Sequence, residues 1–211
     1  MKNLFNYILL SLSVVTLSCS DSSDEMITTD DELINIQIWA LPVEPLSETE
    51  IEALLFMREE EKLARDVYDH LYTIWSSKIF NNISASEQSH TDAVRTLLNK
   101  YKLEDPAINS APGVFVNQEL QTLYTELIQI GSVSLESALK VGAAIEEIDI
   151  LDLQRELGSN VDNEDIILVF ENLMKGSKNH LKSFVLNLKN QNIAYIPQYL
   201  TQEEFDAIIN S

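Results

Sequence analysis

The chain has 211 residues, of which 45% are hydrophobic, enough for one domain with a substantial core. Only five glycines and five prolines interrupt it, which favours a mostly helical domain. Acidic residues outnumber Lys and Arg by 34 to 14, giving a formal net charge of -20. A surface this negative repels phosphate backbones, so the composition argues against a nucleic-acid partner.

The N-terminus carries the pattern of a bacterial export signal. Lys2 precedes the apolar run YILLSLSVVTL, which is too short to span a bilayer and is typical of a secretory signal. Cys19 follows as the single cysteine of the chain, so no disulfide can form within the chain. The stretch TLSC resembles a lipobox, whose cysteine is lipidated and becomes the mature N-terminus, although Thr16 replaces the usual Leu, Val or Ile.

We therefore predict a lipoprotein signal peptide at 1–18 and lipidation at Cys19. The following CSDSSDE resembles the acidic tether that exports some bacterial lipoproteins to the cell surface. This implies a protein of the bacterial cell envelope, lipid-anchored in the outer membrane or displayed on the cell surface. An ordinary signal peptide cleaved elsewhere is the alternative. Residues 19–46 are polar and contain two prolines, which predicts a lipidated tether followed by an irregular segment that packs on the domain.

Residues 47–211 are predicted to form one helical domain. The capping box SETE at 47–50 begins a helix that is expected to run to about residue 75. Glycines at 131 and 158 mark the ends of two later helices. The further helices are expected at about 77–101, 117–131, 134–157 and 162–190, with a last helical turn or two at 201–210.

The loop lengths predict how these helices connect. Almost no loop separates 47–75 from 77–101, or 134–157 from 162–190, so each pair is expected to form an antiparallel hairpin. Roughly 30 residues separate the two hairpins, enough to cross the bundle and to include the helix at 117–131. The predicted fold class is all-α, a four-helix bundle with one long crossover containing an extra helix, which is the arrangement of ferritin-like folds.

Each of the four long helices carries an ionisable residue within an apolar stripe. In the first, Glu61 alternates with Met57, Ala64 and Tyr68 at helical spacing. An isolated buried carboxylate costs several kcal/mol unless it is paired or bound to a cation. Carboxylate with imidazole is the usual donor set for iron or manganese. The corresponding residues of the other three helices are Glu87 with His90, Glu146, and His180.

Neighbouring acidic residues are expected to lie on other faces. Glu59 and Glu147 fall among polar residues at helical spacing, so both are expected to point to solvent. Glu60 is not assigned to either face, because apolar residues flank it at helical spacing.

Each candidate ligand has a purely structural alternative. Ser84 and Glu87 could form a capping box that begins a helix, which would place Phe80 outside that helix. A single buried histidine such as His180 is more often hydrogen-bonded in the core than bound to metal. Glu146, in the acidic stretch EEIDILD, could be a solvated charge. The coincidence on all four helices favours a metal site over these separate explanations.

Several stretches resemble known families. IFNNISASEQSH resembles the rubrerythrin helix that carries Glu-x-x-His, and EKLARDVY resembles a first-helix motif shared by ferritins and rubrerythrins. REEEKLARDVY, SEQSH, GSKNHL and YIPQYLTQEEFDAII together resemble the ferritin-like family called domain of unknown function 2202, over about 47–210. The likeness covers nearly all of the mature chain.

The resemblance implies a ligand set and a cofactor. The implied metal ligands are Glu61, Glu87, His90, Glu146 and His180, and the implied cofactor is iron, with manganese or another divalent metal as alternatives. One position departs from a di-iron pattern, because the second Glu-x-x-His begins here with Ser177. Asp149, one turn beyond Glu146, is a candidate replacement, and a single metal or a weaker pair is the alternative. Tyr68 is a candidate hydrogen-bond donor beside the ligands.

Two classes of function follow. In the first, a ferritin-like, lipid-anchored metalloprotein holds iron that reacts with oxygen or peroxide. In the second, a surface lipoprotein with a structural metal, or none, acts through contacts with other proteins. No rubredoxin-like Cys-x-x-Cys is present, and the family itself implies no known reaction. Protein partners and a homo-oligomer are left open, although a lipid anchor argues against a closed storage cage.

Overall fold

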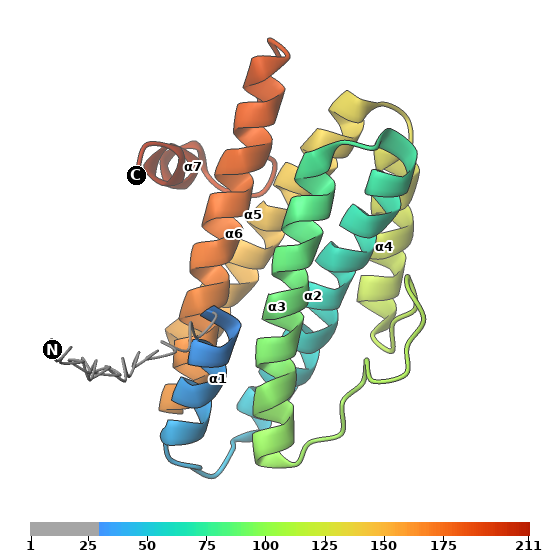
Figure 1. Cartoon of the computed structure of the whole chain (residues 1–211). Helices are drawn as coiled ribbons and strands as arrows, with labels where there is room; N and C mark the ends of the chain where they lie inside the picture. The colour runs from blue at the N-terminus through green and yellow to red at the C-terminus, as the bar shows by residue number, and fades with distance from the viewer. Residues whose placement is uncertain (1–29) are drawn as a thin grey trace, which may run out of the picture.

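The computed structural model describes residues 30–211, and this part of the chain contains seven helices and no strand. The four long helices lie side by side as a bundle (Figure 1). Their bounds are α2 (Glu48–Trp75), α3 (Lys78–Tyr101), α5 (Leu135–Ser159) and α6 (Glu164–Asn190), and the shorter helices are α1 (Asp30–Ala40), α4 (Gln118–Gly131) and α7 (Gln202–Ile209). The all-α prediction is therefore confirmed. Among the described helices, none has both the length and the apolar character needed to cross a bilayer.

The two expected hairpins are present. The predicted capping box begins α2, with Glu50 N donating to Ser47 Oγ at 3.2 Å and Ser47 N donating to the Glu50 carboxylate at 2.8 Å. Ser76 then adopts a left-handed φ of 50°, which ends α2 and turns the chain directly into α3. A similarly short connection joins α5 to α6, so each pair packs as antiparallel neighbours.

The crossover between α3 and α5 contains α4, as predicted, and α4 packs against α2 and α5. Its N-terminus is capped by Asn117, whose side chain accepts from Glu119 N and Leu120 N. At its other end, Trp75 Nε1 donates to the carbonyl of Gly131 at 2.9 Å. This helix therefore covers the outer face of α2 and α5 beside the centre of the bundle.

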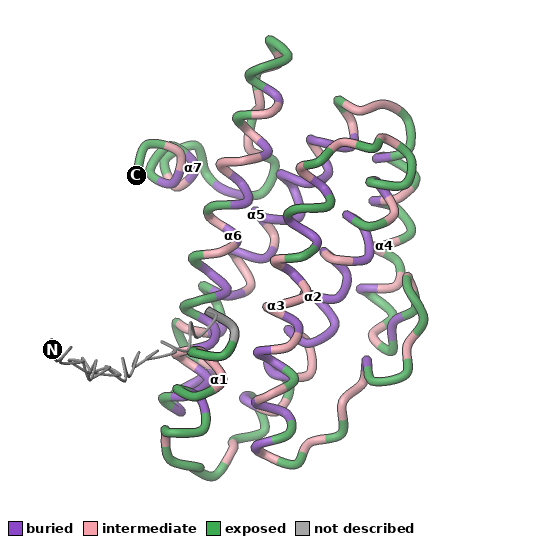
Figure 2. Tube along the Cα trace, in the orientation of Figure 1, coloured by how far each residue is buried: buried purple, intermediate pink, exposed green. Residues whose placement is uncertain are grey.

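The core runs along the inner faces of the long helices, which Figure 2 shows as buried stripes. Three aromatic rings, Tyr68, Phe80 and Phe184, pack together with centroids 5.3–6.4 Å apart. Each fully buried apolar side chain stabilises the fold by about 1.5–3 kcal/mol relative to exposure. This aromatic layer closes one end of the polar centre described below.

The prediction of an irregular segment before the bundle is wrong in part, because residues 30–40 form α1. This helix packs against α3 and α6 with Ile38 fully buried. Its C-terminal carbonyls are satisfied by Lys100, whose Nζ donates to Ile38 O at 2.7 Å and to Leu41 O at 3.0 Å. Lys100 is itself buried and paired with Asp165 at 2.6 Å. A lysine some 60 residues further along the chain therefore stabilises a helix that local sequence signals did not predict.

Residues 1–29 lie outside the described part of the chain. The predicted signal peptide, Cys19 and the first part of the tether fall in this range. Lipidation of Cys19 therefore stays a prediction.

Candidate metal centre

The five candidate ligands converge in the middle of the bundle, as the apolar stripes predicted. They come from all four long helices: Glu61 from α2, Glu87 and His90 from α3, Glu146 from α5, and His180 from α6. The three glutamates and His180 are buried, and His90 is nearly so. Their side chains form two groups that share Glu87.

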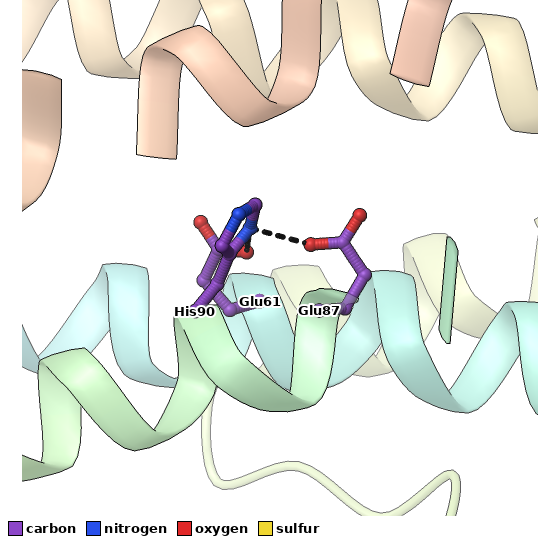
Figure 3. A group of neighbouring side chains, drawn as sticks. All are labelled: Glu61, Glu87 and His90. Carbon is purple, nitrogen blue, oxygen red and sulfur yellow. Dashed lines mark hydrogen bonds and ion pairs between the residues drawn. The ribbon is translucent and has the colours of Figure 1, made fainter. Parts of the chain in front are cut away.

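The first group contains Glu61, Glu87 and His90. His90 Nδ1 lies 2.8 Å from Glu87 Oε2 and 3.1 Å from Glu61 Oε2. Figure 3 shows Glu87 and His90 rising together from α3, with Glu61 beside them from α2. The i, i+3 spacing places the first two on one face of the helix, and packing between α2 and α3 supplies the third.

The second group contains Glu87, Glu146 and His180. His180 Nδ1 lies 2.8 Å from Glu87 Oε1 and 3.5 Å from Glu146 Oε2. Glu87 therefore presents one carboxylate oxygen to each histidine. The two imidazole rings stack with their centroids 5.5 Å apart. This geometry places Glu87 between two donor sets of mixed carboxylate and imidazole character.

The spacing and the hydrogen bonding of the donor atoms fit divalent cations. In each group, one donor atom per residue lies within 4.8 Å of the others, close to the separation of two ligands that share an ion at about 2.0–2.2 Å. Glu61 Oε1, Glu87 Oε1 and His180 Nδ1 are buried and make no hydrogen bond of acceptable geometry, even though the last two are close. Buried polar atoms are nearly always satisfied, so converging atoms without hydrogen bonds make this centre a candidate cation site.

The charges of this centre shift one another's pKa values strongly. Burial, opposed by the charge of His90, leaves the pKa of Glu61 raised to about 7. For Glu87, the two neighbouring histidines outweigh burial and hold its pKa below the usual range. Burial would lower the pKa of His180, but Glu146 and Glu87 raise it to about 10. Without a metal, the centre therefore holds protons on its histidines, and these protons must leave when a metal binds.

Two further side chains orient the candidate ligands. Tyr68 donates to Glu146 Oε1 at 2.5 Å and lies 3.3 Å from Gly142 O, so it fixes the carboxylate as the sequence suggested. Ser86 Oγ lies 3.0 Å from His180 Nε2, which leaves the Nδ1 of that ring facing the carboxylates. The sequence analysis missed Ser86, although its place one residue before Glu87 on the same helix could have drawn attention to it.

A glycine makes room for His90. A Cβ at Gly176 would lie 2.5 Å from both Cε1 and Nε2 of His90. The imidazole would have to move to admit a Cβ there, so glycine at this position lets α6 approach His90 in its observed orientation. The GSKNHL stretch thus supplies a space for His90 as well as the candidate ligand His180.

Ser177 lies where a di-iron pattern would have glutamate, and it contacts the proposed replacement. Its hydroxyl hydrogen-bonds Asp149 Oδ2 on α5 and lies 2.9 Å from Leu173 O. Asp149 Oδ1 is buried without a partner and lines the same small cavity as Glu61, Glu87 and Glu146. Asp149 is therefore positioned to contribute a carboxylate beside Ser177.

The capping alternative for Ser84 and Glu87 is wrong. α3 begins at Lys78, so Phe80 and Ser84 both lie inside the helix. The Ser84 hydroxyl hydrogen-bonds Asp69 on α2 rather than a backbone N–H of its own helix. Glu87 is therefore a mid-helix residue that faces the core.

The predicted solvent exposure of Glu59 and Glu147 is also wrong. Glu59 is 3% exposed and accepts from Val116 N at 2.6 Å and Asn117 N at 2.8 Å, at the start of α4. Glu147 is 0% exposed and accepts from the backbone N–H groups of 198, 199 and 200 and from the Tyr195 hydroxyl. Each lies on the outer face of the bundle, where the crossover or the C-terminal tail covers it. The periodicity of a single helix contains no information about distant segments that pack on its outer face.

A groove gives solvent access to the centre on the histidine side. It has a volume of about 430 Å3 and reaches His90, whose side chain is 13% exposed. The lining is uncharged apart from His90 itself. It consists of Ile34 from α1, Ser86, Ser89 and Ala93 from α3, and Asn172 and Leu173 from α6.

Comparisons with known proteins agree on one family. Residues 50–211 match the family described as "Uncharacterized protein domain (DUF2202)". The chain is 52% identical over 174 residues to the uncharacterized protein MJ0754 of Methanocaldococcus jannaschii, covering 82% of this chain and 94% of the relative. The crystal structure of that hypothetical protein superimposes with a TM-score of 0.79 at 53% identity, covering 81% and 97% of the two chains. The helical-bundle fold is thus shared with an experimentally determined structure.

Proposed function

The chain belongs to the family of the uncharacterized domain DUF2202, and from this premise we propose that it is a ferritin-like metalloprotein with two metal positions in its bundle. The metal is iron, or manganese or another divalent ion with the same preference for mixed oxygen and nitrogen donors. Glu61 and His90 would hold one position, Glu146 and His180 would hold the other, and Glu87 would contribute an oxygen to each.

The observation that carries this proposal is the position of Glu87. Its two oxygens face two different histidines, each at 2.8 Å, and each histidine has a second carboxylate beside it. A structural ion pair needs only one histidine and one carboxylate. A buried carboxylate shared by two imidazoles with unpartnered oxygens around it is instead the arrangement expected for two bridged cations.

The surrounding residues support reaction with a small oxidant. Bound iron would supply electrons to oxygen or peroxide. The groove at His90 gives a small uncharged molecule a path to the centre, and its lining carries no lysine or arginine that would retain an anion. Tyr68 is buried and hydrogen-bonded to Glu146, so it holds that carboxylate in place and can donate a proton locally.

Metal content tests the proposal directly. Protein purified without a His-tag and loaded anaerobically with Fe(II) should contain about two irons per chain. On exposure to oxygen or peroxide it should consume the oxidant and change its absorbance. A chain that retains no metal, or a bound metal that does not react, would contradict the redox function. The latter result would leave only a structural metal.

We also propose that the protein is lipid-anchored in the bacterial cell envelope through Cys19. Cys19→Ala should move the protein from the membrane fraction to the soluble periplasmic fraction or the medium. The measurement is immunodetection after fractionation, with wild type as the control. Unchanged membrane association of the variant would contradict the anchor.

A second candidate function is a protein-interaction module, and one observation favours it. Leu33, Ile36 and Trp39 lie three residues apart on α1 and are 45%, 61% and 58% exposed. Apolar side chains that gather on one helical face are typical of an interaction surface. If the chain proves to bind no metal, Ile36→Asp is the variant with which to test contacts made by this face.

A further inference from the structure

Helix α1 has apolar side chains on both of its faces. Toward the bundle, Ile38 is fully buried and Ile34 packs against the core. On the opposite face, Leu33, Ile36 and Trp39 are exposed. Among the described helices, only α3 and α6 contact α1, so its second face is left uncovered in this part of the chain (Figure 1). A surface helix normally turns polar side chains outward, and an apolar exposed face therefore indicates a further contact.

The position of α1 in the chain links it to the proposed membrane anchor. The family match begins at residue 50, beyond the end of α1 at Ala40, so α1 lies outside the family domain. Ten residues separate the start of α1 from Cys19, the residue proposed to carry the lipid. A backbone of this length spans at most about 40 Å, even when it is fully extended. With Cys19 lipidated, α1 is the described helix nearest to the anchor along the chain, and it begins within this distance of the bilayer.

The chemistry of the exposed face fits a lipid surface without net charge. Trp39 has an amphipathic indole ring, which is enriched at the interface between membrane and water. Helix α1 contains no lysine or arginine, and the whole chain has a formal net charge of -20. Attraction to anionic lipids therefore cannot drive the contact, and burial of the apolar side chains must do so. Zwitterionic headgroups satisfy this condition.

We propose that the exposed face of α1, formed by Leu33, Ile36 and Trp39, docks on the zwitterionic surface of the membrane that holds the lipidated Cys19. The inference rests on the proposed anchor and adds a second contact between the same chain and the bilayer. Because the lipid and α1 are connected, this second contact forms at a high effective concentration. A small apolar face that would bind membranes weakly by itself is then sufficient. The side of the bundle that carries α1 would be fixed toward the bilayer.

The test measures whether Trp39 enters the bilayer. The mature lipidated chain is reconstituted without metal in phosphatidylcholine vesicles, with and without bromine on the acyl chains as a fluorescence quencher. Trp75 is the second tryptophan of the chain, and it lies on α2, which α1 does not contact. Trp39→Phe leaves only Trp75 and therefore measures the background fluorescence.

Brominated lipid should quench the Trp39 signal, taken as wild type minus Trp39→Phe, by about twofold, because an interfacial helix buries its apolar face ~5–10 Å deep. Ile36→Asp should abolish this quenching while the protein stays on the vesicles through its lipid. Ile36 is 61% exposed, so the fold should be retained, which a thermal melt checks. Ile196→Asp is the matched control, since Ile196 is 75% exposed in the segment before α7, and it should be quenched like wild type.

Vesicle-bound wild type with an unquenched Trp39 would overturn the inference and leave the anchor intact. A Cys19→Ala chain that forms a dimer, together with a Cys19→Ala, Ile36→Asp chain that does not, would assign the exposed face to a second copy of the chain and would also overturn it. Mass spectrometry of Cys19 tests the anchor separately. An unmodified Cys19 would contradict the anchor, and the inference would fail with it. Neither result bears on the metal centre, because no candidate ligand lies on α1.

Discussion

Two sets of buried glutamates in this bundle differ in what satisfies them. Glu59 and Glu147 lie on the outer face, where backbone N–H groups of the crossover and the tail donate to their oxygens at 2.6–2.9 Å. Glu61, Glu87 and Glu146 lie on the inner face, where they meet two histidines, one tyrosine and one another.

This difference distinguishes carboxylates that the protein itself satisfies from carboxylates that could bind a metal. Fixed backbone donors compensate the outer glutamates within the protein itself, and each ties a connecting segment to the bundle. Glu61 and Glu87 each retain one buried oxygen that accepts no hydrogen bond, and the charged groups beside the inner glutamates are histidines that can lose their protons. Burial alone therefore does not make a carboxylate a candidate ligand. The number of hydrogen-bond donors that reach it distinguishes the two sets.

Removal of the shared ligand should have the largest effect. Glu87→Ala deletes a donor from both groups, so both metals should be lost. The decrease in affinity should exceed the 10–100-fold cost of losing a residue that only orients a ligand. Iron per chain after anaerobic loading and desalting measures it. If Glu87→Ala retained two metals, the bridging role would be excluded.

Removal of an outer glutamate should lower the stability of the fold and leave metal binding unchanged. Glu147→Ala leaves the backbone N–H groups of 198–200 without their acceptor, which should destabilise the fold by about 3–5 kcal/mol. The loss should be equal with and without metal, because Glu147 does not reach the centre. Urea unfolding under both conditions measures it, and a loss that appears only with metal would contradict the distinction drawn above.

The pH dependence of stability should reverse when metal binds. Without metal, Glu61 has a folded pKa of about 7 and His180 of about 10, both above their values in the unfolded chain. The folded state then holds more protons, so stability should fall as pH rises from about 5 to 10. With metal, rising pH removes the protons that compete with the metal for the ligand atoms. Stability should therefore increase until these ligands are fully deprotonated.

Thermal melts between pH 5 and 9 measure this reversal. The metal-free Tm should fall by roughly 5–10 °C over this range, and the metal-loaded Tm should rise over its lower part. The Glu147→Ala variant should show the same pH dependence of Tm with and without metal, with a lower Tm throughout. Parallel curves with and without metal would show that the titrating groups are not ligands.

The smallest effect is expected when a carboxylate is moved across the centre. Ser177→Glu alone places a second acid beside Asp149, which should cost a few kcal/mol without metal and be recovered when metal binds. Ser177→Glu combined with Asp149→Ala transfers the carboxylate from α5 to α6. The double variant should keep the metal count of wild type, with affinity changed by about tenfold or less.

Thermal melts of both variants with and without Fe(II) provide the measurement. Ser177→Ala serves as the control, since it removes the hydroxyl that positions Asp149 without adding a charge. If added metal fails to recover the stability lost in Ser177→Glu, Asp149 and Ser177 do not adjoin a metal position.

The sequence alone determined the long helices and the inner set of ionisable residues. Apolar periodicity, the capping box at Ser47 and short loops are local signals, so they predicted α2, α3, α5 and α6 and their pairing. The same periodicity placed Glu61, Glu87, His90, Glu146 and His180 on inward faces, where the structure brings them together. Apolar residues flank Glu60 at helical spacing, and the structure buries this residue as well.

Only the tertiary structure decided which outer faces are covered. Glu59 and Glu147 look solvated on an isolated helix, but α4 and the segment before α7 lie over them and supply backbone donors. Lys100 on α3 likewise donates to carbonyls at the end of α1 and just beyond it, a contact that the sequence around α1 could not reveal. Periodicity specifies a face relative to the helix axis, whereas a hydrogen bond between distant segments depends on where the whole chain folds.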